Sequence, residues 1–98
     1  MGKEKVFEKK VKDFLRSKAP MVWYYKNWAG PYSQSGIPDI IVCANGNFLG
    51  VEIKAEDGKP SELQTRNINR IKAAGGTAYI LYPKDFETFK EDIINLIK

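Results

Sequence analysis

The stretch Gly36–Lys54, which reads GIPDIIVCANGNFLGVEIK, decides the fold of this chain. Its two apolar runs, Asp39–Ala44 and Asn47–Lys54, are joined by Asn45-Gly46. An Asn-Gly pair between two β-rich runs favours a two-residue hairpin turn, because both central positions of that turn need a positive φ. The stretch therefore predicts an antiparallel hairpin.

This hairpin brings three charged residues together. Counting outward from the turn places Asp39 opposite Glu52, and Lys54 follows on the same face two residues later. Opposed side chains have Cβ atoms ~4.5–5.5 Å apart, so two like charges need a raised pKa, an ion pair with Lys54 or a bound cation. At a solvated strand end, an ion pair with Lys54 would be enough to offset this repulsion. The surrounding Ile and Val residues instead predict a buried strand, where a divalent cation between the acids is the simplest solution.

Hydrophobic periodicity around the hairpin predicts three helices and two further strands. We expect helices over 3–18, 61–74 and 85–98, strands over 21–26 and 77–82, and a loop over 27–35. The strand that ends the hairpin would connect through a helix to the strand at 77–82, which is a parallel βαβ unit. The predicted fold class is α/β: one domain, 1–98, with a small mixed β-sheet flanked by helices in the order α-β-β-β-α-β-α.

The composition narrows the possible chemistry. The 98 residues include no histidine and one cysteine, which excludes histidine-dependent triads and zinc sites built from histidine or several cysteines. Carboxylates, lysines, amides and hydroxyls remain, and oxygen ligands favour hard cations such as Mg²⁺ or Mn²⁺. The net charge of +4 permits a nucleic-acid partner.

The sequence also indicates a cellular setting. No apolar run approaches the roughly 20 residues that span a membrane, and the charged start MGKEKVFEKK lacks the apolar segment of a signal peptide. The single cysteine, Cys43, cannot form an internal disulfide. We therefore expect a cytoplasmic protein with no membrane partner.

The hairpin motif resembles that of a known nuclease superfamily. Pro38-Asp39, twelve residues, and then Glu52-Ile53-Lys54 resemble the PD-(D/E)XK motif of restriction-endonuclease-like enzymes. The segments SGIPDIIV, VEIKAEDGKPSELQ and AAGG are more narrowly similar to the virus-type replication-repair nuclease domain, VRR-NUC. The likeness covers nearly the whole chain, and it implies a restriction-endonuclease-like fold and a metal-dependent phosphodiesterase.

The resemblance implies specific roles at the motif. Asp39 and Glu52 would hold Mg²⁺ or Mn²⁺ together with the backbone carbonyl of Ile53. Lys54 would orient or deprotonate the attacking water and stabilise charge on the phosphate. The resemblance also implies a glutamate ligand on the first helix. The surrounding FEKKV pattern favours Glu8, and Glu4 is the alternative.

Gln64 matches the glutamine that the resemblance places at the start of the helix after the motif. Gln64, Ile68 and Ile71 form one stripe, so Gln64 would face the sheet near the motif and position Lys54, the water or a phosphate. The alternative is structural, because Ser61-x-x-Gln64 fits a capping box in which the glutamine reaches back to the Ser61 backbone.

The loop before the motif could contact nucleic acid. Trp28 and Tyr32 could stack on unpaired bases, or could simply cover the core. Ser33, Gln34 and Ser35 directly precede the motif and could contact phosphate.

The resemblance implies an endonuclease acting on DNA, with branched, flapped or four-way (Holliday) junction DNA as the expected repair or recombination substrate. A non-catalytic nucleic-acid-binding module on the same fold and a nuclease acting on structured RNA are the alternatives. The family resemblance suggests a phage or mobile-element source.

We also expect a homodimer, because coordinated cleavage of two strands needs two sites. The aromatic strand Met21–Tyr25 and the final helix, with Ile93, Ile94 and Ile97, offer apolar surface for its interface.

Overall fold

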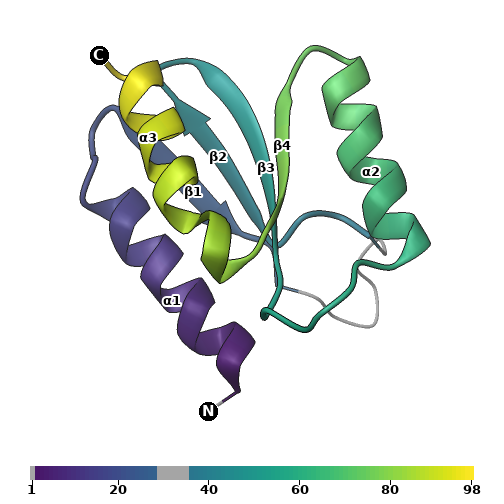
Figure 1. Ribbon diagram of the computed structural model, residues 1–98. Coiled ribbons are helices and arrows are strands. Elements are labelled where there is room, and N and C mark those ends of the chain that lie inside the picture. The colour runs from purple at the N-terminus through teal and green to yellow at the C-terminus, as the bar shows by residue number, and fades with distance from the viewer. Residues whose placement is uncertain (1, 29–35) are drawn as a thin grey trace.

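The computed structural model describes residues 2–28 and 36–98 and has the predicted order of elements (Figure 1). The elements are α1 (Lys3–Arg16), β1 (Val22–Lys26), β2 (Ile40–Ala44), β3 (Asn47–Ile53), α2 (Glu62–Ala73), β4 (Thr77–Leu81) and α3 (Phe86–Leu96). A short 3₁₀ turn, Pro83–Asp85, precedes α3. The predicted α/β class and the α-β-β-β-α-β-α order are confirmed.

The four strands form one mixed sheet in the order β1-β2-β3-β4. The β1–β2 and β2–β3 pairs are antiparallel, and β3 and β4 are parallel as the βαβ unit requires. Asn45 and Gly46 both adopt positive φ, at 49° and 83°, and the hairpin pairs Ala44 with Asn47 and Ile40 with Val51. The register is therefore the one predicted from the turn.

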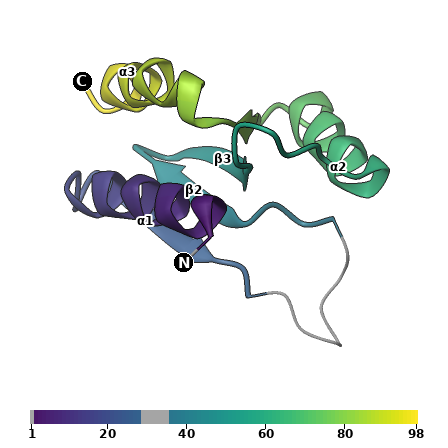
Figure 2. The ribbon, with the colours of Figure 1, turned by 60° about the horizontal axis from the view of Figure 1, so that its bottom comes forward.

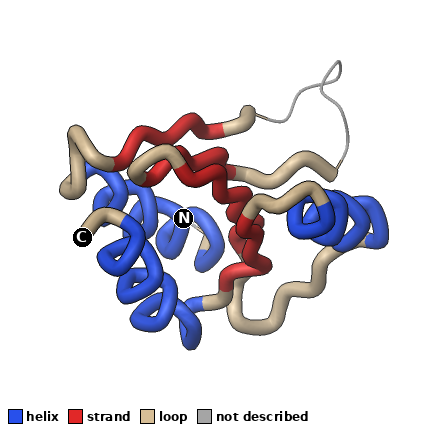
Figure 3. Tube along the Cα trace, turned by 90° about the horizontal axis from the view of Figure 1, so that it is seen from above, coloured by secondary structure: helices blue, strands red, loops and turns tan. Residues whose placement is uncertain are grey.

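Helices α1 and α3 cover one face of the sheet, and α2 lies on the other face (Figure 3). Figure 2 shows the same division, with α2 apart from the α1–α3 pair. Between the paired helices and the sheet lie Val11, Leu15, Val42, Val51 and Phe89, all fully buried. None of the helices in the described part of the chain is both long and apolar enough to cross a bilayer.

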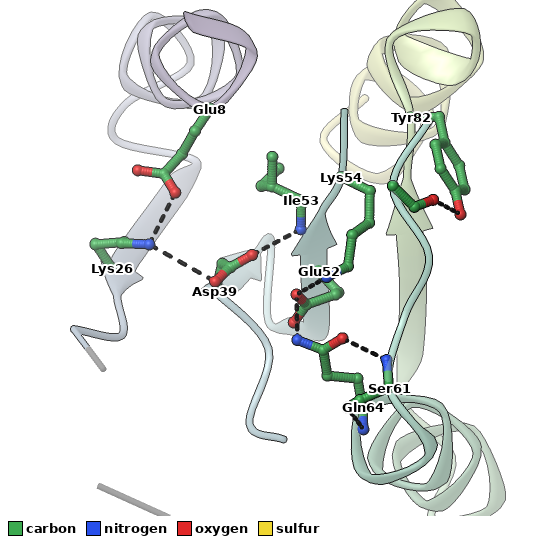
Figure 4. A network of polar contacts seen from close by, with 10 residues as sticks. Glu8, Lys26, Asp39, Glu52, Ile53, Lys54, Ser61, Gln64 and Tyr82 are labelled. Carbon is green, nitrogen blue, oxygen red and sulfur yellow. Dashed lines mark hydrogen bonds and ion pairs between the residues drawn. The ribbon is translucent and has the colours of Figure 1, made fainter. Parts of the chain in front are cut away.

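Helix α2 packs closely on β3 and β4 at a glycine. A Cβ atom at Gly50 would lie only 2.8 Å from Cδ1 of Ile71, so the absent side chain lets the helix approach the sheet. Ile68 is the buried residue of this helix. This packing brings the N-terminal turn of α2 to the end of β3, where the motif residues lie (Figure 4).

Candidate active site

Asp39 and Glu52 lie next to each other at one end of the β2–β3 hairpin (Figure 4). Asp39 directly precedes β2 and continues the register beyond the Ile40–Val51 pair. Its Oδ2 accepts a hydrogen bond of 2.9 Å from the backbone N–H of Ile53, which fixes the carboxylate beside β3. The structure thus brings together the two acids that the hairpin register predicts to be neighbours.

Glu52 is a buried acid whose contacts leave one of its oxygens unused. It is 2% exposed, and its Oε2 accepts a 2.9 Å hydrogen bond from Nε2 of Gln64. Its Oε1 is buried and has no hydrogen-bond partner among the residues that the structure describes. Burial, and then the negative charge of Asp39, raise the pKa of Glu52 to about 8, against a smaller opposite effect of Lys54. Burial and Asp39 therefore outweigh the ammonium group of Lys54 and favour the neutral form of Glu52.

The two carboxylates fit a hydrated divalent cation. A cation would satisfy the unpaired Oε1 of Glu52 and offset its repulsion from Asp39. Within residues 2–28 and 36–98, no three acidic, histidine or cysteine side chains form a group that could enclose a metal ion. Mg²⁺ does not need such a group, because it usually binds through one or two carboxylates and keeps several waters.

Lys54 lies beside the buried acid. Its Nζ is 3.6 Å from Oε2 of Glu52, and its side chain is only 14% exposed. Its backbone N–H donates to the carbonyl of Leu81, which extends the pairing with β4. The hydroxyl of Tyr82 donates to the carbonyl of Gly58 at 2.9 Å and so holds the connection that follows. The backbone of Lys54 is thus held by its bond to Leu81, and the loop that follows is held by Tyr82.

Gln64 combines the two roles that the sequence presents as alternatives. Its Oε1 accepts a 2.8 Å hydrogen bond from the backbone N–H of Ser61, and its own backbone N–H donates to the Ser61 hydroxyl, so the capping box is present. Its Nε2 donates to Glu52. Because the cap fixes the amide oxygen, it also directs the amide nitrogen toward the acid.

Glu8 is held by two lysines instead of lying beside the other two acids. Its Oε1 accepts from Nζ of Lys26 at 2.8 Å, and its Oε2 is 3.4 Å from Nζ of Lys12. Burial acts to raise the pKa of Glu8, but the two lysines outweigh it and keep the pKa below its usual value. The alternative, Glu4, is exposed. Both glutamates line the groove that also reaches Asp39, and Lys26 lies between Glu8 and the acid pair.

Lys26 is a site residue that the sequence analysis missed. Its Nζ lies between Glu8 and Asp39, 3.7 Å from Oδ1 of Asp39 (Figure 4). Alternation along β1 places Lys26 on the same face as Val22 and Tyr24, toward α1. This alternation can be read from the sequence, and it was the feature that could have pointed to Lys26.

The residues expected to contact nucleic acid are only partly described. Tyr32, Ser33, Gln34 and Ser35 lie outside the described residues. Trp28 is 73% exposed, and Nζ of Lys26 lies 5.7 Å from the centre of its ring. Trp28 and Asp39 help to line a groove of about 630 Å³ between α1 and the end of β1. The structure thus places Trp28 beside the acids and outside the core.

Neither family models nor curated proteins give a match to this chain. Among solved structures, a chain described as a VRR_NUC domain is similar, with a TM-score of 0.69 and 22% sequence identity. The likeness covers 99% of this chain and 96% of that chain. This protein has the fold of a VRR_NUC domain. The fold that the motif resemblance implies is therefore confirmed over essentially the whole chain, and in this VRR_NUC fold the acid pair lies at one end of the hairpin.

Proposed function

We propose that this protein is a Mg²⁺-dependent endonuclease that hydrolyses phosphodiester bonds in DNA. The observation that carries the proposal is the buried Glu52 carboxyl, which lies beside Asp39 with one oxygen unpaired among the described residues and a lysine within 4 Å. A VRR_NUC-type fold supports a nuclease function, since the name of the similar domain denotes a nuclease.

Each side chain of the site has a role in this proposal. Asp39 and Glu52, with the carbonyl of Ile53, would hold the cation, which supplies Lewis-acid stabilisation of the phosphate and activation of water. Lys54 would orient the attacking water and stabilise negative charge that develops on the phosphate. Gln64 would keep the Glu52 carboxylate in place through its amide hydrogen bond. Mn²⁺ would bind the same oxygen ligands.

The proposed substrate is branched DNA, cut by a homodimer with two sites. The described surface supports β1 as the interface instead of α3. Trp23 and Tyr25 are 62% and 51% exposed on the face of the sheet opposite α1, whereas on α3 Ile93 is fully buried and Ile94 is 38% exposed. Twofold symmetry would match a symmetric four-way junction.

A substrate panel tests this function. The protein would be incubated, in Mg²⁺ or in EDTA, with four kinds of DNA: duplex, single-stranded, flapped and four-way-junction. The corresponding RNA substrates would be treated in the same way. We expect cleavage of branched DNA in Mg²⁺ only, and none by Asp39→Asn purified identically. Preferred RNA cleavage would support the RNA-directed alternative. Binding without cleavage of any substrate would support the non-catalytic module.

A further inference from the structure

The acid pair belongs to a larger cluster of alternating charges. Its negative members are Glu8, Asp39 and Glu52, and its positive members are Lys12, Lys26 and Lys54. The contacts run from α1 through the end of β1 to β3 (Figure 4). When all six groups are ionised, the cluster is electrically balanced. A divalent cation held by the acid pair would add two positive charges that these residues do not neutralise.

Lys26 is the lysine on the outer side of Asp39. Its side chain is 17% exposed, which is little for a lysine at the end of an edge strand. It helps to line the groove of about 630 Å³ between α1 and β1, which also reaches Asp39 and Trp28. An ammonium group has three N–H donors, and its two carboxylate contacts leave one for a further acceptor. A phosphate lying in the groove beside the acid pair would therefore meet Lys26.

Glu8 is placed to fix the position of the Lys26 side chain. It approaches the lysine at 2.8 Å, closer than Asp39 does at 3.7 Å, and Lys12 holds its other oxygen. Two half-buried ion pairs on one carboxylate leave it poorly placed to bind a cation as well. The contact also ties the end of β1 to α1.

From these contacts we propose that Lys26 binds a backbone phosphate of the substrate in the groove beside Asp39. In this arrangement Glu8 is a positioning residue that acts through Lys26 and is not a metal ligand. The inference rests on the proposed nuclease function for the identity of its substrate. It adds a second lysine to the site, on the opposite side of the acid pair from Lys54.

Salt-dependent DNA binding tests the Lys26 contact. Binding of a fluorescein-labelled four-way DNA junction would be measured at several salt concentrations, with Ca²⁺ in place of Mg²⁺. Losing one phosphate contact lowers the slope of log affinity against log salt by about one. We expect this lower slope for Lys26→Met and for Lys26→Gln. Lys26→Arg keeps the positive charge and should have the slope of the wild type. The control is Lys90→Met, which removes another partly buried, ion-paired lysine, on α3.

Calorimetric titration with Mn²⁺ tests the role of Glu8. We expect Glu8→Gln to keep the Mn²⁺ affinity of the wild type, whereas loss of a carboxylate ligand would lower it as much as Asp39→Asn does. We also expect Lys26→Met to weaken junction binding less in the Glu8→Gln background than in the wild type, because the two residues act together.

Two results would overturn the inference. One is an unchanged salt slope in a folded Lys26→Met or Lys26→Gln protein, which would exclude the phosphate contact. The other is a loss of Mn²⁺ affinity in Glu8→Gln as large as that in Asp39→Asn, which would make Glu8 a ligand. Neither readout needs cleavage, so a lack of Mg²⁺-dependent cleavage would contradict the proposed function alone.

Discussion

At the scale of single residues, Glu52 governs the pH dependence expected of the metal-free protein. The folded chain keeps the Glu52 proton up to a pKa of about 8, whereas the unfolded chain releases it near 4.5. The folded state therefore binds more protons between these values, and the free energy of unfolding falls as the pH rises from about 4.5 to 8. Glu8, whose pKa is lowered, changes charge below this range.

Glu52→Gln should remove this dependence. The neutral amide keeps the shape without the buried charge, so at pH 9 and without metal we expect the variant to be more stable by on the order of 2–4 kcal/mol. At pH 5 the two proteins should melt alike. Thermal melts in EDTA measure this, with the exposed Glu91→Gln as control. If the wild type and Glu52→Gln had equal melting temperatures at both pH values, Glu52 would be ionised in the folded protein.

Lys54→Ala should separate catalysis from metal binding. Lys54 contacts Glu52 at 3.6 Å, but its ammonium group cannot be a metal ligand, so Mn²⁺ affinity should persist. Loss of a group that orients the water and stabilises charge should lower the single-turnover rate by about 10²–10⁴-fold. The control is Lys59→Ala, an exposed lysine in the following loop. Loss of Mn²⁺ binding in Lys54→Ala would instead give Lys54 a structural role in the site.

At the scale of elements, the capping box joins α2 to the site. Ser61→Ala removes one capping hydrogen bond, and we expect a loss of about 1 kcal/mol in unfolding free energy with cleavage retained. Gln64→Ala removes the cap and the amide contact to Glu52, so stability and cleavage should both fall. Urea denaturation and single-turnover cleavage measure the two effects. Equal cleavage losses in the two variants would reduce the role of Gln64 to capping.

Prediction from the sequence succeeded where local chemistry fixes geometry. The Asn45-Gly46 turn sets the register by its two positive φ angles, and the register then places Asp39 beside Glu52. The Ser61 and Gln64 pair likewise fixes the start of α2. Both are contacts within a few residues or across one tight turn.

The sequence failed at Lys26 because its position depends on a long connection. The segment from Asn27 to Asp39 has no turn signal that sets the pairing of β1 with β2, so the pairing of Lys26 with Ile40 could not be counted. Without that register, Glu8 had no visible partner on β1, so nothing in the sequence set an ion pair with Lys26 against the ligand role that the family resemblance implies. The separation of Glu8 from the acid pair by Lys26 follows from tertiary packing of α1 on β1.

At the scale of the whole molecule, the exposed aromatic face of the sheet predicts self-association. Trp23, Tyr25 and Phe48 are each about half exposed, and register places Trp23 and Phe48 on either side of Cys43. An aromatic side chain has ~150–250 Å² of surface, and about half of it is still exposed here. Three such residues from each of two chains would therefore bury roughly 600 Å². That is about half of the ~1,200 Å² at the lower end of stable interfaces, so neighbouring residues would supply the rest.

Trp23→Glu should therefore give a monomer. The side chain is 62% exposed, so the charge should be tolerated by the fold but repelled in a twofold interface. Sedimentation at micromolar concentration should show a dimeric wild type and a monomeric variant, with dimeric Ile94→Glu on α3 as control. A monomeric wild type that still cuts both strands of a junction with simultaneous kinetics would contradict the dimer.

The central claim is that Asp39 and Glu52 together hold a divalent cation, and calorimetric titration with Mn²⁺ at pH 8.5 tests it most directly. We expect the wild type to bind Mn²⁺, with an affinity that falls about tenfold per pH unit below about 8, because the cation displaces the Glu52 proton. Asp39→Asn should lose more than about tenfold in affinity, whereas Asp57→Asn in the exposed loop should not. Equal Mn²⁺ binding by wild type and Asp39→Asn, or no binding by the wild type, would contradict the claim.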